Sequence, residues 1–203
     1  EEPLIENALE KIESEKITIV PDFLAEGYFT RQVIPQLLKL DSLPDTVSYR
    51  PPVGTHPMMQ KLILSAACDV AGDWRPEETS LLLIGHGSTK NSNSKQTLLD
   101  HLEVIRGMGH FAEVFDLWLE EEPFIQQWQN LVSLNQVIVV PFLLSDGQHG
   151  GWDIPEMLGI EKEREVHCVT HQLGKHDLRV APALGTSARF VEVIESVARG
   201  GIP

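Results

Sequence analysis

The sequence predicts an α/β protein with two similar halves, each built on a parallel β-sheet, the first half being incomplete. Two observations predict this class. Residues 1–38 align with residues 121–158 at a constant offset of 120 without a gap, and internal repeats of this kind indicate duplicated structure. Short apolar runs also alternate with segments of helical periodicity, the order typical of parallel sheets with helical crossovers.

The matching positions of the repeat include prolines and a glycine as well as apolar residues. Matching positions hold Glu1, Glu2, Pro3, Ile5, Val20, Pro21, Leu24, Gly27, Ile34, Pro35 and Leu38 in the first copy and Glu121, Glu122, Pro123, Ile125, Val140, Pro141, Leu144, Gly147, Ile154, Pro155 and Leu158 in the second. Further on, Pro52-Val53-Gly54-Thr55 resembles Ala183-Leu184-Gly185-Thr186. Proline and glycine restrict or free the backbone in specific ways, so their shared register indicates shared geometry.

Four short apolar runs are predicted to be strands: 17–20, 81–84, 112–117 and 137–140. The first and last are β-branched and end at proline, as buried parallel strands do.

Helices are expected between these strands. Leu98, Leu99, Leu102 and Ile105 recur at helical spacing, in a helix that should stop at Gly107 or Gly109. Further helices are expected to begin at about Pro123 and at Ile154-Pro155, and Thr186 is expected to cap a last helix that runs toward Ala198.

The second copy, residues 79–203, contains the complete order β-α-β-α-β-α-β-α, whereas residues 1–72 hold only its later half. Residues 73–78 are the expected linker. A parallel sheet without its early strands would expose an edge and part of its core. We therefore expect the natural chain to continue upstream of Glu1, the alternative being a first copy that has degenerated.

Composition excludes several classes of function. The formal net charge of −14, from 30 acidic and 16 basic residues, has the wrong sign for binding nucleic acid or an anionic membrane. No apolar run approaches the roughly 18–20 residues of a membrane span. The two cysteines, Cys68 and Cys168, are far apart, which argues against a disulfide scaffold or a cysteine metal site. A cytoplasmic protein without nucleic-acid or membrane partners is expected.

Two histidines follow predicted strands in glycine-rich segments. His86 lies between Gly85 and Gly87, just after strand 81–84, and His149 lies in segment 145–151, after strand 137–140. Ligands bind at the carboxyl ends of parallel strands, so the two imidazoles could face one cleft. Imidazole is a usual ligand of cobalt, nickel, iron and zinc. The residues alone therefore allow an open two-histidine metal site, or two polar loop residues satisfied by the backbone.

The residue patterns around the two histidines are distinctive. Leu83-Ile84-Gly85-His86-Gly87-Ser88 resembles the hydrophobic-G-H-G-S opening of the small sirohydrochlorin cobalto- and ferrochelatases, the CbiX-like family. Val139-Val140-Pro141-Phe142-Leu143-Leu144, then His149 and Asp153-Ile154-Pro155, resembles that family's P-x-F-L…H-x-x-x-D-I-P segment. Glu122-Pro123 and Ala181–Gly185 resemble its E-P and A-x-x-L-G motifs. The resemblance covers essentially all of 79–203 and, more faintly, 1–72, as in a long, two-copy form.

This resemblance implies a chelatase-like fold whose two halves enclose a tetrapyrrole cleft, with His86 and His149 as the catalytic and metal-binding residues. It implies insertion of a divalent metal substrate, Co²⁺, Fe²⁺ or Ni²⁺, into a sirohydrochlorin-type tetrapyrrole, without an organic cofactor. A homo-oligomer is left open, as are the metal and the pathway. The alternative is a non-catalytic metal or tetrapyrrole carrier of the same fold. A hydrolase built on Ser88, His149 and Asp153 is disfavoured, because no G-x-S-x-G motif is present.

Several residues depart from the family pattern. Leu119 stands where family members carry a glutamate, and Glu120 could replace that residue only if the strand has ended or bulged there; otherwise it belongs to a solvated acidic helix start. In the first copy Phe29 occupies the place of His149 and Val33 that of Asp153. We expect Phe29 to pack in the core, the alternative being that Tyr28 and Phe29 pack against the tetrapyrrole ring.

Other polar residues receive weaker assignments. Asp153 is expected to cap the helix at Ile154, the alternative being that it orients His149. His167, His171 and His176 are expected to be incidental residues of a hairpin. Lys90 and Lys95 could meet substrate carboxylates or be solvated charges.

Overall fold

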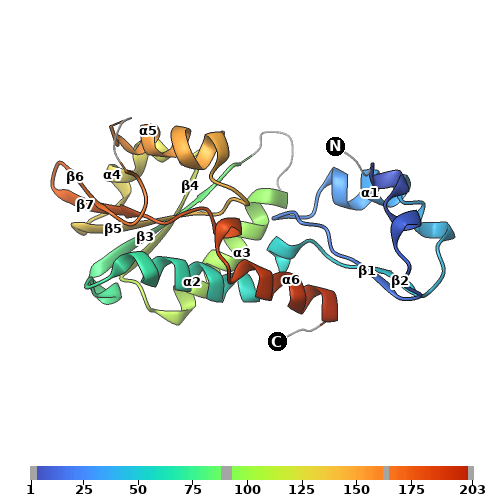
Figure 1. The fold of residues 1–203 in the computed structure, drawn as a ribbon. Helices are drawn as coiled ribbons and strands as arrows, with labels where there is room; N and C mark the ends of the chain where they lie inside the picture. Colours follow the sequence, from blue (N-terminus) through green and yellow to red (C-terminus); the bar gives the residue numbers. More distant parts are fainter. Residues whose placement is uncertain (1–3, 88–92, 162–164, 201–203) are drawn as a thin grey trace.

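The computed structural model describes residues 4–87, 93–161 and 165–200, with Asn93 and Ser94 described by their backbone alone. The chain forms a five-stranded sheet in the order β4-β3-β5-β7-β6 and a separate two-stranded sheet, β1-β2 (Figure 1). The strands are β1 Ile17–Ile19, β2 Val47–Tyr49, β3 Thr79–Gly85, β4 Glu113–Trp118, β5 Gln136–Pro141, β6 Thr170–Leu173 and β7 His176–Val180. The helices are α1 Ile34–Leu37, α2 Met58–Ala71, α3 Asn93–Met108, α4 Trp128–Leu131, α5 Ile154–Leu158 and α6 Phe190–Arg199.

The larger sheet is parallel except at one edge. β3 pairs in parallel with β4 and β5, and β5 pairs in parallel with β7. β6 joins β7 as an antiparallel hairpin at the edge, as expected for the segment with the three late histidines. Every residue of β3 is buried, because helices cover both faces of the sheet. The predicted α/β class with mostly parallel strands is confirmed.

The sequence repeat is also a structural repeat. In the first half Ile17 pairs with Val47, and at the corresponding place in the second half Val137 pairs with Leu178. The turn after each later strand passes very close to the segment after each earlier one. A Cβ added at Gly54 would lie 2.1 Å from the carbonyl oxygen of Leu24, and one added at Gly185 would lie 2.1 Å from that of Leu144. Both copies need glycine here because backbone packs directly on backbone.

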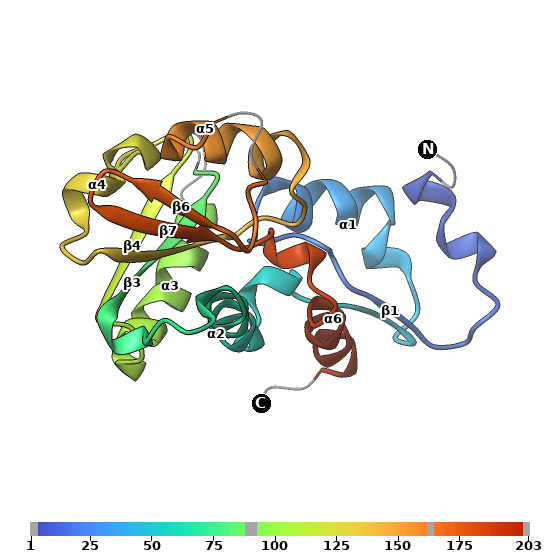
Figure 2. The same ribbon diagram turned by 60° about the vertical axis from the view of Figure 1, so that its left-hand side comes forward.

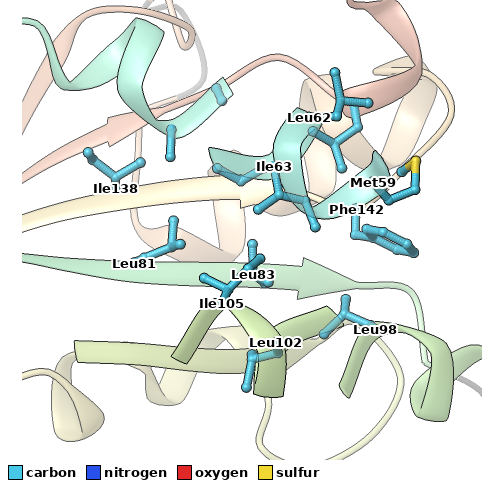
Figure 3. Close-up of a cluster of buried hydrophobic side chains, with 14 of the residues drawn as sticks. Met59, Leu62, Ile63, Leu81, Leu83, Leu98, Leu102, Ile105, Ile138 and Phe142 are labelled. Atoms are coloured by element: carbon cyan, nitrogen blue, oxygen red, sulfur yellow. The ribbon is translucent and has the colours of Figure 1, made fainter. Parts of the chain in front are cut away.

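Helix α2 belongs to the first copy by sequence, yet it covers the sheet of the second half. Its side chains Met59, Leu62 and Ile63 are buried in one cluster with Leu81 and Leu83 of β3 and with residues of α3 (Figure 3). Helix α6, from the second copy, lies beside α2 and contacts the turn Val53–Thr55 of the first half (Figure 1, Figure 2). Each copy therefore contributes its last helix to the packing of the other.

The alternate side chains of β3 face the opposite layer. Leu82 and Ile84 join a second buried cluster with Trp128 of α4 and with Ile154 and Leu158 of α5. Two hydrophobic layers thus enclose β3, and the segment that follows it is positioned by both. None of the helices in the described parts of the chain is long and apolar enough to span a membrane.

Three predicted helix starts were displaced. The helix expected at about Pro123 begins as a 3₁₀ turn at Ile125 and continues as α4. Thr186 does not cap α6: its hydroxyl donates to the carbonyl of Ala183 at 2.7 Å within a 3₁₀ turn, and α6 begins at Phe190. The helix expected at Ile154 begins earlier, because a π-helical turn, His149–Asp153, runs directly into α5.

Candidate metal centre

The two candidate histidines meet at the carboxyl edge of the larger sheet. His86 follows β3, and His149 is the first residue of the π-helical turn after the neighbouring strand β5. Their ring centroids are 4.9 Å apart and the ring planes are nearly perpendicular, at 86°. Both side chains are partly open to solvent, with exposures of 40% and 49%. The structure therefore brings together the pair that strand order predicted.

The hydrogen bonds of these rings decide which nitrogen is free. His149 Nδ1 lies 2.7 Å from Asp153 Oδ2, and His86 Nδ1 lies 3.1 Å from the carbonyl oxygen of Gly87. A carboxylate and a carbonyl both only accept, so in the neutral rings each Nδ1 carries the proton and donates it. The lone pair of each imidazole then lies on Nε2. A histidine that ligates a metal commonly donates its other N–H to a carboxylate or a backbone carbonyl in this way.

Asp153 does not have its expected capping role. It has helical backbone angles and makes no capping hydrogen bond, because the π-helical turn places it inside a continuous helical segment. Asp153 follows His149 by four positions, and side chains at that spacing share one face of a helix. The alternative interpretation, in which Asp153 orients His149, matches the geometry.

Glu120 satisfies the condition under which it could replace the family glutamate. β4 ends at Trp118, and the amides of Leu119 and Glu120 then donate to the carbonyls of Gly85 and His86 at 3.2 and 3.1 Å. Leu119 packs against the second buried cluster. Glu120 instead approaches the pair, with Oε2 at 3.9 Å from His86 Nδ1. It therefore neighbours the nitrogen that faces Gly87, rather than Nε2.

A hollow of about 280 Å³ lies beside His149, between the two halves. Phe23 and Leu24 of the first half line one side of it, and residues 143–149 line the other. Phe23 and Leu24 correspond in the repeat to Leu143 and Leu144, so matching segments of the two copies face each other across the hollow. The hollow lies between the two halves, where the family resemblance implies a tetrapyrrole cleft.

The first copy keeps the backbone of the site but not its chemistry. Phe29–Val33 forms a π-helical turn at the place that corresponds to His149–Asp153. Phe29 is not a core residue, as had been expected: it is 58% exposed and makes an edge-to-face contact with Tyr28 at 5.9 Å. Trp152, in the second turn, is also 62% exposed. Together with Tyr28, which is 63% exposed, these are the most exposed aromatic side chains among the described residues.

The remaining candidates lie apart from the histidine pair. His171 and His176 are buried and bond to the backbone carbonyls of Val166 and Leu134, and His167 approaches Asp146 at 3.6 Å. Lys95 is not a solvated charge: it lies in α3, pairs with Glu121 at 2.9 Å and stacks over Trp118. Ser88 and Lys90 lie outside the described residues. Across the described ranges, no three His, Cys, Asp or Glu side chains are grouped to hold a metal ion.

Two parallel-sheet halves with a histidine pair at the strand ends define a chelatase-type α/β protein. The sequence profile of the CbiX family matches residues 1–70 and 80–199, which covers both copies. The chain therefore belongs to the CbiX family.

Individual relatives agree with this assignment. A probable sirohydrochlorin cobaltochelatase of Halobacterium salinarum is 33% identical over all of this chain, which spans 78% of that protein. A multi-domain Deinococcus radiodurans protein with structural similarity to chelatases is 26% identical over 97% of this chain, with a TM-score of 0.79, and this chain spans 43% of it. SirB of Bacillus subtilis, solved with Fe³⁺, shares the fold, with a TM-score of 0.76 at 19% identity over 100% of this chain and 81% of SirB.

Proposed function

We propose that this chain inserts a divalent metal ion into a sirohydrochlorin-type tetrapyrrole, with His86 and His149 as the ligands that hold the metal before transfer. The observation that carries the proposal is the pair of imidazoles, with ring centroids 4.9 Å apart, whose Nδ1 atoms both lie near an acceptor and whose Nε2 atoms have no hydrogen-bond partner among the described residues. The name of the Halobacterium relative, a cobaltochelatase, supports cobalt as the first metal to test.

An enzyme that hands its metal to another ligand needs a site that does not close around the ion. A structural zinc site uses four protein ligands, whereas two imidazoles leave positions for water and for the incoming pyrrole nitrogens. As the divalent ion enters the macrocycle, two pyrrole N–H protons must leave. Glu120, exposed and with Oε2 3.9 Å from His86 Nδ1, is a carboxylate available to accept one proton, and the second can pass to solvent because the site is open.

We place one edge of the tetrapyrrole in the hollow between the two halves, because a hollow of about 280 Å³ is too small for the whole ring. Its flat π-system matches exposed aromatic side chains, and Tyr28, Phe29 and Trp152 provide them on the two corresponding π-helical turns. The cleft is then asymmetric: the second half supplies the metal ligands, and the first half supplies an apolar wall. Lys95 is engaged by Glu121, so it would have to leave that partner to meet a substrate carboxylate.

The test is anaerobic incubation with sirohydrochlorin and Co²⁺, Fe²⁺ or Ni²⁺, followed by the absorption change on metallation. His149→Ala should abolish insertion and leave the circular dichroism spectrum unchanged. His110→Ala is the matched control and should leave the insertion rate unchanged, because His110 is exposed just before the amino end of β4. An unchanged insertion rate in His149→Ala would end the assignment. The preferred metal would indicate whether the chain serves cobalamin or siroheme synthesis.

A carrier of metal or tetrapyrrole is the second candidate function. It is favoured by the loss of the histidine and aspartate from the first copy, where Phe29 and Val33 stand instead. The two functions differ in turnover. A chelatase yields many metallated products per chain, whereas a carrier binds one equivalent and stops.

A further inference from the structure

Arg50 differs from the other arginines of this acidic protein. It follows β2, it is half-buried, and its Nε atom is buried without a hydrogen-bond partner. Every other described arginine pairs with a carboxylate, the longest separation being 3.8 Å for Arg106 and Asp116. Among the described residues Arg50 makes no such pair, although the chain has 30 acidic residues against 16 basic ones. Leaving a partly buried cation unpaired costs stability, so the position calls for an explanation.

Arg50 lines a cavity of about 260 Å³ that is separate from the histidine pair. Pro51, Pro52 and Pro57 and the side chain of Val197 from α6 give the cavity apolar walls. Its other polar side chains are already engaged. Thr55 Oγ1 donates to the carbonyl of Pro52 at 2.8 Å, and His56 Nδ1 accepts from the amide of Met58 at 3.2 Å. The guanidinium is therefore the charged group with capacity for a ligand.

Capping of a helix does not account for Arg50. Its guanidinium packs against Gly200 at the end of α6, where an added Cβ would lie 3.0 Å from Nη2, but it makes no hydrogen bond to the carbonyls of that helix. Arg179 shows what capping looks like in this protein. It donates to the carbonyls of Val70 and Ala71 at the end of α2 and also pairs with Asp73.

The carboxylate of Glu26, which lies near Arg50, is already paired with another arginine. Glu26 lines an adjoining hollow that Arg50 shares, and Glu26 is bound by Arg31. Nothing among the described side chains therefore neutralises Arg50.

We propose that this cavity binds a small organic carboxylate with an apolar body. The guanidinium can receive the carboxylate through two parallel N–H···O bonds, and the prolines and Val197 can cover the apolar part. Pockets for drug-sized ligands measure roughly 300–1,000 Å³, so this cavity suits a smaller molecule than a tetrapyrrole. The site is separate from metal insertion and does not rest on the proposed function.

The test uses benzoate, with neutral benzamide as a probe of the same shape, in isothermal titration calorimetry at low ionic strength. Benzoate should bind the native chain with one site, and benzamide should bind at least about tenfold more weakly, because it lacks the charge. Arg50→Met should weaken benzoate binding by a similar factor. Arg189→Met is the matched control, since Arg189 is an exposed arginine paired with Asp69 outside the cavity.

Arg50→Lys keeps the charge and serves where Arg50→Met does not fold. It should also bind benzoate more weakly than the native chain, because an ammonium lacks the planar fork. The proposal is overturned if the native chain does not bind benzoate, if benzamide binds equally well, or if the Arg50 variants bind as tightly as the native chain.

Discussion

Removal of the Asp153 carboxylate tests the orientation of His149 directly. Asp153→Ala takes away the acceptor 2.7 Å from His149 Nδ1, so the ring loses the partner that fixes its tautomer and direction. Loss of such a partner commonly lowers metal affinity or activity by about 10- to 100-fold. The side chains of His149 and Asp153 are 49% and 31% exposed, and water can replace part of the interaction. We therefore expect the lower end, about tenfold, or about 1.4 kcal/mol.

Asp153→Asn should fall between the native chain and the alanine variant. Its Oδ1 can still accept from Nδ1, but without the negative charge, and the difference between charged and neutral hydrogen bonds is worth about 1 kcal/mol, or roughly fivefold. Binding of Co²⁺, followed by calorimetry and by its visible absorption, measures all three affinities. Asp45→Asn, in the exposed turn before β2, removes the same charge at the opposite end of a strand and should bind normally. Native affinity in Asp153→Ala would refute the orienting role.

Three further changes test other parts of the structure. Glu120→Gln should weaken Co²⁺ binding by no more than about fivefold, since exposed charge pairs contribute about 0.2–1 kcal/mol; a total loss would instead make Glu120 a ligand. Burial lowers the pKa of His101 below 6.5, so the folded state binds fewer protons than the unfolded one. Denaturant unfolding should therefore show stability that is present above pH 6.5 and falls as the pH drops below it, by at most about 1.4 kcal/mol per pH unit, and His101→Gln should flatten this slope. Gly185→Ala should lower the free energy of unfolding by about 1–3 kcal/mol, because the added Cβ would lie 2.1 Å from the backbone of Leu144. Gly107→Ala in α3 is the control, because nothing lies within 4 Å of its added Cβ and the stability should not fall. Equal melting temperatures for the two variants would contradict the close packing at Gly185.

The convergence of His86 and His149 could be predicted because it depends on strand order alone. Both residues follow strands of one parallel sheet, and the carboxyl ends of such strands meet at one edge. The family and the chelatase-like fold were predicted from short motifs at these ends, and the comparisons confirmed them. The division into residues 1–72, 73–78 and 79–203 stays a prediction, as do the roles of the two histidines.

The role of Asp153 could not be predicted, because rules for helix starts take no account of a π-helical turn. The wider turn carries the helix back to His149 and moves Asp153 from a cap to an interior position. The four-residue spacing between the two was the one available signal. The exposure of Phe29 was missed because apolar character predicts burial unless a ligand surface is already known.

The place of α2 was also beyond prediction. An amphipathic pattern shows that a helix buries one face, but not which sheet that face covers. By sequence α2 falls within the first copy, residues 1–72, but it packs on the sheet of the second half.

The crossed placement of α2 and α6 sets the order in which a growing chain can complete its structure. α2 leaves the ribosome before the sheet that it covers, so the larger half finds its layer already made. β1 and β2 leave the ribosome well before α6, which lies beside them (Figure 1, Figure 2). The small sheet must therefore wait until α6 has been made. During that interval it is the segment most open to chaperones, proteases and pairing with other strands.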